Sequence, residues 1–283
     1  MKRVVFSAMG TSVDVTAPTD GGIAATRQLF EDVERSCSRF LPESELTRIN
    51  DGAATRVPVS PNMARVLQVA AHARSITGGL VDAGVGGAVN AWGYDRTFTA
   101  VADRDHDAVT EHVPEPVWSV QGAVLTRSPG TRIDLGGIAK GWTCDLAVER
   151  GHATVVSAGG DVRSSDPETT VEIVDPWDET ATTIRLGIGA LATSSVSRRR
   201  WRIGGWEANH LIDPRTMRPT SSPVLSATAM TTTAAEAEAA AKAILLRGAD
   251  GLAWADRQPW ITGALVVWHD GNVFGTAGLE IAA

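Results

Sequence analysis

The stretch RIDLGGIAKGWTCDLA, residues 132–147, combines a carboxylate, a glycine pair and a lysine at the expected start of a helix. Gly136 and Gly137 allow the backbone to approach a ligand closely, and successive N–H groups at a helix N-terminus attract anions. Lys140 adds a point charge. The stretch is neither a Walker loop nor a G-x-G-x-x-G fingerprint. By itself the stretch is therefore compatible with two interpretations, a phosphate-binding site and a plain turn between a strand and a helix.

The composition is typical of a globular protein and bounds the possible functions. The 283 residues suffice for one large domain or two intimate lobes, and the formal net charge of −7 argues against a general nucleic-acid binder. Cys37 and Cys144 are too few for a disulfide framework, and we expect both in the core. No apolar run has the length of a membrane span or secretory signal, so we expect no membrane insertion and a cytoplasmic location. The basic run 198–202 favours a solvated edge.

Hydrophobic spacing and turn residues predict a mixture of helices and antiparallel strands. Strands outnumber what a strict βαβ alternation would give, which favours an α+β architecture with two packed lobes. The expected elements are two strands around Gly10, helices at 21–37, 61–76 and within 231–248, a strand at 183–192, and a terminal hairpin at 263–276.

Three further stretches carry side chains that could take part in catalysis or ligand binding. SAGGDVR, residues 157–163, offers a glycine pair and an acid, although a tight hairpin turn explains it equally well. His210 stands near Asp213 and could act as a general base, although a lone histidine is more often structural. Glu238 and Lys242 lie four residues apart on the alanine-rich helix. Their simplest interpretation is an intrahelical ion pair of about 0.3–0.5 kcal/mol, but the neighbouring residues on the helix are apolar, so this face is not expected to be fully solvated.

Eight short segments follow one another along almost the whole chain: MGT (9–11), SRFLPESELTRIN (38–50), TGGLVDAGVGGAVNAWGY (77–94), IDLGGIAKGW (133–142), SAGGDVR (157–163), ALATSS (190–195), NHLIDPRT (209–216) and the alanine-rich helix. In this order they resemble the ApbE family, flavin transferases that move FMN from FAD onto a protein hydroxyl. The resemblance implies a single ApbE-like, T-fold-related domain over residues 1–283. In it, mixed sheets and helices form two closely packed lobes, and FAD lies in the cleft between them.

The resemblance implies roles toward the flavin end of FAD for five residues. Met9 would line the flavin site, and Phe40 stands where the family has an aromatic residue that stacks on the ligand. Asp82 lies in the segment that contacts the flavin. Ile212 would pack near the isoalloxazine or adenine ring. His210 matches the histidine that deprotonates the target serine or threonine.

The resemblance also implies a nucleotide-binding role for the opening stretch. Asp134 would accept hydrogen bonds from adenosine or ribose. The turn at Gly136 and the Lys140 ammonium would meet the diphosphate. Gly137 is near the backbone carbonyl that completes the family's metal shell.

The chain departs from the family at the metal. The family's final helix typically reads Asp-Ala-Leu-Ala-Thr, with the aspartate and threonine bound to magnesium, whereas this chain has Glu238 and Lys242 in those positions. Glutamate keeps the charge, but a protonated lysine has no lone pair for a metal. We therefore hypothesise that Lys242 stands in for Mg²⁺ and neutralises the diphosphate. Ser195 and Met217 also replace glycines of the family pattern, which predicts altered local turns.

The function that this resemblance implies is an FAD:protein FMN transferase with FAD as its substrate. A serine or threonine hydroxyl of an acceptor protein would attack the FMN phosphorus, His210 would take the proton, and AMP would leave. The positive charges of Lys140 and Lys242 would neutralise the negative charge that develops on the diphosphate. Three alternatives stay open: an FAD-binding protein without transferase activity, an FAD pyrophosphatase that releases FMN and AMP, and a generic anion-binding domain.

Overall fold

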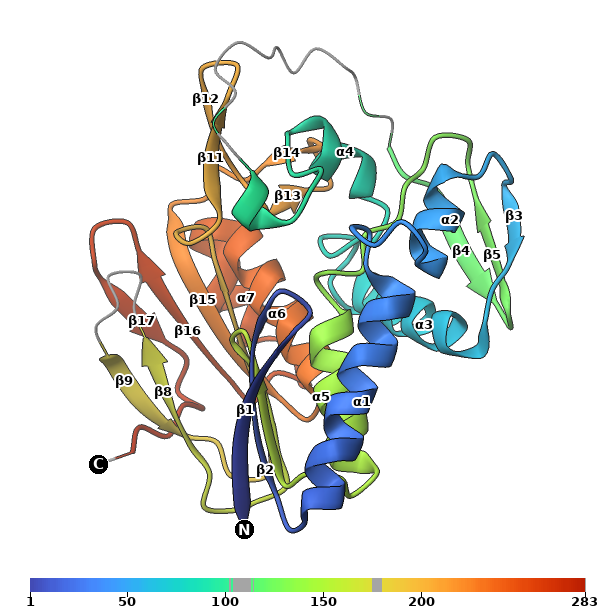
Figure 1. Ribbon diagram of the computed structural model, residues 1–283. Coiled ribbons are helices and arrows are strands. Elements are labelled where there is room, and N and C mark those ends of the chain that lie inside the picture. The colour runs from blue at the N-terminus through green and yellow to red at the C-terminus, as the bar shows by residue number, and fades with distance from the viewer. Residues whose placement is uncertain (102, 104–112, 114, 175–179, 283) are drawn as a thin grey trace. The chain divides into compact units, whose positions relative to one another are not determined.

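The computed structural model describes residues 1–101, 103, 113, 115–174 and 180–282, which form two compact units (Figure 1). The first unit comprises Met1–Asp32, Ile138–Ser197 and Ser222–Ala283, and the second comprises Val33–Gly137 and Arg198–Ser221. Helices and strands are mixed along the chain, which confirms the expected α+β class. The assignment of residues 1–283 to a single domain stays a prediction.

An antiparallel sheet of eight strands forms the framework of the first unit. Its order is β1-β2-β6-β7-β10-β15-β16-β17, so strands from both ends of the chain meet in one sheet. The strands are β1 (Lys2–Ala8), β2 (Thr11–Ala17), β6 (Val155–Ala158), β7 (Asp161–Ser164), β10 (Gly189–Ser195), β15 (Val224–Thr231), β16 (Gly263–Trp268) and β17 (Val273–Gly275).

Along β10, the two faces of this sheet bury side chains of different size. On β10, Ala190 and Ala192 belong to a cluster that includes residues of the helices α1 (Asp20–Cys37), α5 (Ala139–Glu149) and α6 (Ala234–Arg247). Leu191 points to the other face and packs with the β8 (Thr170–Val174) and β9 (Thr180–Arg185) hairpin. Because alanine projects little from a strand, α6 packs closely on β10 and β15.

Local signals fix both ends of α6. The Thr233 hydroxyl accepts a hydrogen bond from the Glu236 N–H at 3.3 Å, and Gly248 ends the helix with φ of 60°. These are the N-cap and C-terminal glycine that the sequence predicted. A short 3-10 turn (Gly248–Asp250) then leads into α7 (Gly251–Ala255).

Gly141 allows α5 to approach the N-terminus of α6. A Cβ atom at this position would lie 2.8 Å from both the carbonyl carbon and the oxygen of Ala234, which are backbone atoms that cannot rotate away. We expect Gly141→Ala to lower the free energy of unfolding by about 1–3 kcal/mol, measured by chemical denaturation. Gly21→Ala is the matched control, because a Cβ there meets only the Thr19 hydroxyl at 3.8 Å. Equal stability of the two variants would contradict the close approach.

The second unit combines short helices, a small sheet and two hairpins. Two tryptophan side chains join these parts: Trp201 Nε1 donates to the Trp92 carbonyl at 2.7 Å, and Trp92 Nε1 donates to the Met217 carbonyl at 3.1 Å. The elements are α2 (Glu45–Asp51), β3 (Arg56–Pro58), α3 (Pro61–Ile76), α4 (Gly86–Ala91), a 3-10 turn (Phe98–Ala100), β4 (Trp118–Gln121), β5 (Val124–Arg127), β11 (Arg200–Ile203), β12 (Trp206–Asn209), β13 (Ile212–Asp213) and β14 (Arg218–Pro219).

One local expectation was wrong. The segment 183–192 is not one strand, because the chain turns at Gly187, where φ is 60°, between β9 and β10. The altered local turns at Ser195 and Met217 stay a prediction. Met217 itself adopts φ of 55° and buries its side chain beside Trp92. Both cysteines are buried as expected.

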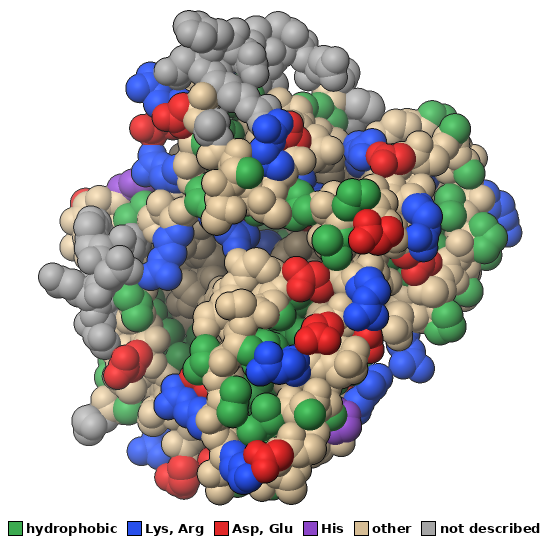
Figure 2. Space-filling view, viewed as in Figure 1, with side chains coloured by type: hydrophobic (Ala, Val, Ile, Leu, Met, Phe, Trp, Pro, Cys, Tyr) green, Lys and Arg blue, Asp and Glu red, His purple; other side chains and the backbone are tan. Residues whose placement is uncertain are grey.

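No described helix is both long and apolar enough to cross a membrane. On the face drawn in Figure 2, acidic and basic side chains are interspersed. In the basic run 198–202, Trp201 is buried while Arg200 and Arg202 are exposed on β11, so the run forms a solvated edge with one core residue.

Candidate functional site

Two lysines converge on one buried carboxylate in the first unit. Lys140, in the first turn of α5, places its Nζ 2.9 Å from Glu238 Oε1, and Lys242, one turn after Glu238 on α6, places its Nζ 3.0 Å from the same oxygen. The Glu238 side chain is 5% exposed, and the lysine side chains are 13% and 15% exposed. The pair of Glu238 and Lys242 is therefore not a solvated surface ion pair.

Asp161 adds a second carboxylate to this group. It follows the turn at Gly159 and Gly160, whose φ values of 60° and 102° require glycine, and it begins β7. Its Oδ2 lies 3.1 Å from Lys140 Nζ, and its side chain is 3% exposed. The hairpin-turn interpretation of SAGGDVR is thus confirmed, but that interpretation missed the acid next to it. We call Lys140, Asp161, Glu238 and Lys242 the lysine–carboxylate cluster.

Burial and mutual attraction set the protonation states in the cluster. Burial alone would raise the pKa of Glu238, but Lys140 and Lys242 lower it to about 2. Burial, together with the charge of Glu238, raises the pKa of Asp161 to about 6 against the effect of both lysines. Burial opposes the charge on Lys140, yet Asp161 and Glu238 raise its pKa. Two cations therefore face two anions at neutral pH.

The cluster does not fit a magnesium ion. Mg²⁺ requires oxygen ligands at about 2.0–2.1 Å in octahedral geometry, and Glu238 Oε1 already has two ammonium groups at hydrogen-bond distance. A dication on that oxygen would lie within about 5 Å of both ammonium groups, and its repulsion with each would cost about 7 kcal/mol at an effective dielectric constant of about 20. Among the described residues, no group of three or more His, Cys, Asp or Glu side chains is placed to hold a metal ion.

Asp145 of α5 holds the start of α6 beside the cluster. Its two carboxylate oxygens accept hydrogen bonds from the N–H groups of Ala234 and Ala235, at 2.7 and 3.0 Å. Arg163 Nε lies 3.4 Å from one of these oxygens. Because Ala234 and Ala235 open the helix that carries Glu238, Asp145 fixes the position of α6 relative to α5. Sequence inspection gave no reason to single it out.

Met9 forms the turn between β1 and β2 with Gly10. Ala8 pairs directly with Thr11, so the loop has two residues, and both have positive φ, 51° and 68°. This is the conformation of a type I′ turn, which favours asparagine and glycine. The Met9 side chain packs against the core cluster of the first unit. A strained methionine here is consistent with the predicted contact to flavin.

Met9→Asn separates strain from ligand contact. We expect the free energy of unfolding to change by less than about 1 kcal/mol, because relief of the left-handed strain offsets the lost packing. If Met9 contacts the flavin, the affinity for FAD falls in the same variant. Denaturation and a fluorescence titration with FAD measure the two effects. Unchanged affinity would remove Met9 from the site.

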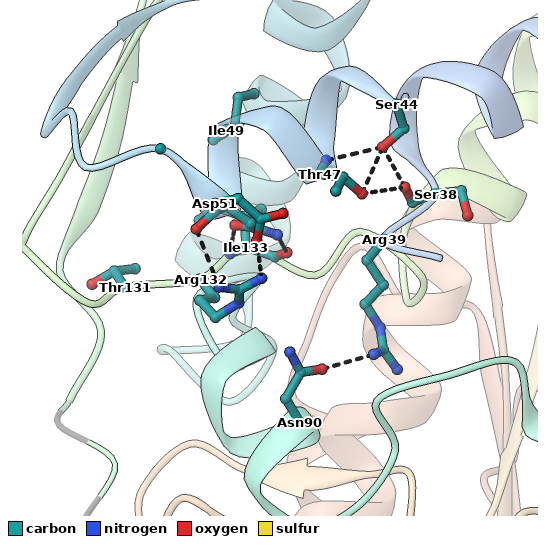
Figure 3. Close-up of polar contacts among 12 residues, drawn as sticks. Ser38, Arg39, Ser44, Thr47, Ile49, Asp51, Asn90, Thr131, Arg132 and Ile133 are labelled. Carbon is teal, nitrogen blue, oxygen red and sulfur yellow. Dashed lines mark hydrogen bonds and ion pairs between the residues drawn. The ribbon is translucent and has the colours of Figure 1, made fainter. Parts of the chain in front are cut away.

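In the second unit, Arg39 contacts two predicted site residues, Asp134 and Phe40, and also Asn90, the contact drawn in Figure 3. Its Nε lies 2.9 Å from Asp134 Oδ2, and its Nη1 donates to Asn90 Oδ1 at 2.9 Å. The guanidinium lies 4.2 Å from the ring centroid of Phe40 and 4.5 Å from that of Tyr94. Arg39 stands directly before Phe40 in a segment that matched the family, but sequence reasoning singled out only the aromatic residue.

Asp134 uses both carboxylate oxygens within the protein. Oδ2 faces Arg39, and Oδ1 accepts a hydrogen bond from the Gly136 N–H at 2.7 Å. The preceding backbone is held by Asn50 of α2, whose amide exchanges two hydrogen bonds of 2.8 Å with Ile133. Asp134 therefore shapes the loop that leads through Gly137 to Lys140. Its predicted contact with adenosine or ribose stays a prediction.

Asp82 also has partners inside the second unit. Its Oδ1 accepts from Trp118 Nε1 at 2.6 Å and from the Gly84 N–H at 2.7 Å, while Arg74 Nε lies 3.1 Å from Oδ2. These bonds fix the loop between α3 and α4. The predicted contact of this segment with flavin is not tested by them.

His210 stands in a constrained turn between β12 and β13. Asn209 braces the turn by accepting from the Leu211 N–H at 3.0 Å and donating to the Thr220 carbonyl at 3.0 Å. Asp213, which stands near His210 in the sequence, accepts hydrogen bonds from the Arg215 side chain at 2.6 and 2.9 Å. His210 is half-buried.

The predicted site residues are distributed over both units. In the first unit, Lys140, Glu238 and Lys242 meet in the lysine–carboxylate cluster, whereas Met9 lies in a hairpin turn. The remaining predicted residues belong to the second unit: Phe40, Asp82, Asp134, Gly136, Gly137, His210 and Ile212, the last of which is buried in the core with Trp92. Sequence reasoning gave no role to Arg39, Asp145 or Asp161.

Comparison with known proteins assigns a family to this arrangement. The family model described as "ApbE family" matches residues 9–265, a range that contains every predicted site residue. A protein of Vibrio cholerae named FAD:protein FMN transferase is 26% identical over 88% of this chain and 82% of its own. A Rhodobacter capsulatus protein of the same name is 31% identical over 87% of this chain, which spans half of that relative.

Solved structures show the same fold. The ApbE protein of Thermotoga maritima matches with a TM-score of 0.81 at 24% identity, covering 98% of this chain and 97% of that one. The flavin transferase ApbE of Vibrio cholerae matches with a TM-score of 0.77 at 23% identity and the same coverage. The resemblance first seen in eight short segments is confirmed: this chain belongs to the ApbE family.

Proposed function

We propose that this protein is an FAD:protein FMN transferase. The observation that supports this most strongly is the family match over residues 9–265, together with relatives of that name aligned over more than four-fifths of the chain. FAD is the substrate, and the acceptor is a serine or threonine hydroxyl of another protein.

The reaction replaces the phosphoanhydride bond of FAD by a phosphodiester bond between FMN and the acceptor. The acceptor oxygen forms a bond to the FMN phosphorus, and the bond between that phosphorus and the bridging oxygen of the diphosphate breaks. His210 takes the hydroxyl proton, and AMP leaves with the bridging oxygen. Phosphoryl transfer needs positioning and charge neutralisation more than covalent help from the enzyme.

The roles of the other residues follow from their chemistry. Lys140 and Lys242 oppose the charge that develops on the diphosphate, and the loop from Asp134 through Gly136 and Gly137 leads directly into Lys140. Met9, Phe40, Asp82 and Ile212 contact the flavin or adenine rings. No step is assigned to a metal, because the cluster around Glu238 does not fit one.

Mass spectrometry of a co-expressed acceptor domain tests the proposal. A mass gain equal to FMN less one water, with AMP as the released product, is the expected result. Release of both FMN and AMP without an acceptor would instead identify an FAD pyrophosphatase. Stable binding of FAD without release of AMP would identify a binding protein.

A further inference from the structure

Lysine is rare in this chain, and its placement is selective. Of the 26 basic residues only Lys2, Lys140 and Lys242 are lysines, and the other 23 are arginines. Two of these three meet at one carboxylate oxygen, from segments about a hundred residues apart. Lys2 is an exposed residue that pairs with Asp20. A chain that otherwise uses arginine thus has lysine at both cationic positions of the cluster.

The geometry of the cluster explains the use of lysine there. An ammonium is a compact point charge, whereas a guanidinium is a planar fork that needs more room. Lys140 Nζ lies within 3.1 Å of both Asp161 and Glu238, and all three side chains are at most 13% exposed. Apart from Glu238, the buried residues of α6 are alanine, isoleucine and leucine. The cluster is thus a small polar site bordered by the apolar buried residues of α6.

The cluster is complete in charge without a further cation. Two ammonium groups face two carboxylates; both ammonium groups share Oε1 of Glu238, whereas Oε2 is buried without a hydrogen-bond partner among the described residues. Lys242, four residues after Glu238, donates hydrogen bonds, whereas a metal would need an oxygen ligand at this position. A divalent ion bound to either oxygen of Glu238 would lie close to the Lys242 ammonium, which repels it.

We propose that the Lys242 ammonium replaces a divalent cation, so that this protein binds the diphosphate of FAD without a metal. The inference rests on the proposed function, because it takes FAD as the ligand. It goes beyond that function in two respects. It states that this chain binds FAD without a metal, unlike a metal-dependent transferase, and it names Lys242 as the residue that takes the place of the metal.

The test measures FAD affinity, which does not depend on turnover. The full-length protein is titrated with FAD by calorimetry, once in EDTA and once in excess MgCl₂. We expect wild-type affinities that agree within about threefold. In Lys242→Thr, which puts a hydroxyl one turn after Glu238, we expect at least tenfold weaker binding in EDTA and recovery with Mg²⁺.

Lys2→Thr is the matched control, because it makes the same substitution at an exposed lysine and should leave both affinities unchanged. A titration of wild type with MgCl₂ alone, expected to give no binding, tests the inference even if Lys242→Thr fails to fold. Magnesium-dependent FAD binding by wild type would overturn the inference and leave the proposed function intact. Lys242→Thr that binds FAD in EDTA as tightly as wild type would also overturn it. Absence of FAD binding in both buffers would overturn the proposed function, and the inference with it.

Discussion

Replacing His210 by alanine is expected to slow FMN transfer by about 10²–10⁴-fold, the usual contribution of a positioned general base. The attacking hydroxyl would then lose its proton to water, which is not held in position. FAD affinity should stay within about threefold of wild type, because the proton is taken from the acceptor and not from FAD. Single-turnover transfer to the acceptor domain measures the rate, and a titration measures the affinity.

Two variants make this result specific. His269→Ala removes an exposed histidine from a surface turn and should leave the transfer rate unchanged. Asp213→Asn tests whether an acid assists His210, and we expect less than about a tenfold loss because Asp213 is bound to Arg215. Transfer by His210→Ala at the wild-type rate would exclude His210 as the base.

Local signals in the sequence predicted the elements whose ends are set by neighbouring residues. Ser60 accepts from the Met63 N–H at 3.2 Å and starts α3 directly before Pro61, as the sequence indicated. Thr233 and Gly248 bound α6 in the same way. Caps and turns depend on contacts within a few residues, so a single sequence contains the information that specifies them.

Contacts between distant segments were the part that could not be predicted. Lys140 meets Glu238 across 98 positions because α5 and α6 pack side by side on one sheet, and periodicity carries no trace of that pairing. Arg39 reaches Asp134 for a similar reason, through the fold of the second unit. The resemblance identified the positions of Lys140 and Glu238, but it did not reveal that Lys242 points at the same oxygen.

Asp145→Ala is expected to lower the free energy of unfolding by roughly 3–5 kcal/mol at pH 7. The change removes both acceptors for the N–H groups of Ala234 and Ala235, and it deprives the Arg163 guanidinium of its nearby carboxylate. Because the lost contacts hold the start of α6, the lysine–carboxylate cluster should loosen as well. Chemical denaturation measures the stability, and FAD titration reports on the cluster.

Asp145→Asn keeps the shape of the side chain and removes its titration. Burial raises the pKa of Asp145 to about 7, from 3.8 in an unfolded chain, although the two N–H donors and Arg163 oppose the shift. Between about pH 4 and pH 7 the folded protein holds a proton that the unfolded chain has lost. The stability contributed by Asp145 therefore falls as pH rises through this window and is constant above it.

Asp145→Asn lacks this pH dependence, so the difference in the free energy of unfolding between the variant and wild type should change with pH. Between pH 4 and pH 7 the free energy of unfolding of Asp145→Asn should rise relative to wild type by roughly 2–4 kcal/mol, at about 1.4 kcal/mol per pKa unit. Asp14→Asn is the control, because Asp14 is a surface partner of Arg3 on the sheet. Chemical denaturation at pH 4, 5, 6 and 7 gives the slope of the free energy of unfolding against pH for each protein. A constant difference between wild type and Asp145→Asn would mean that Asp145 is ionised throughout, held as a carboxylate by the helix N-terminus and Arg163.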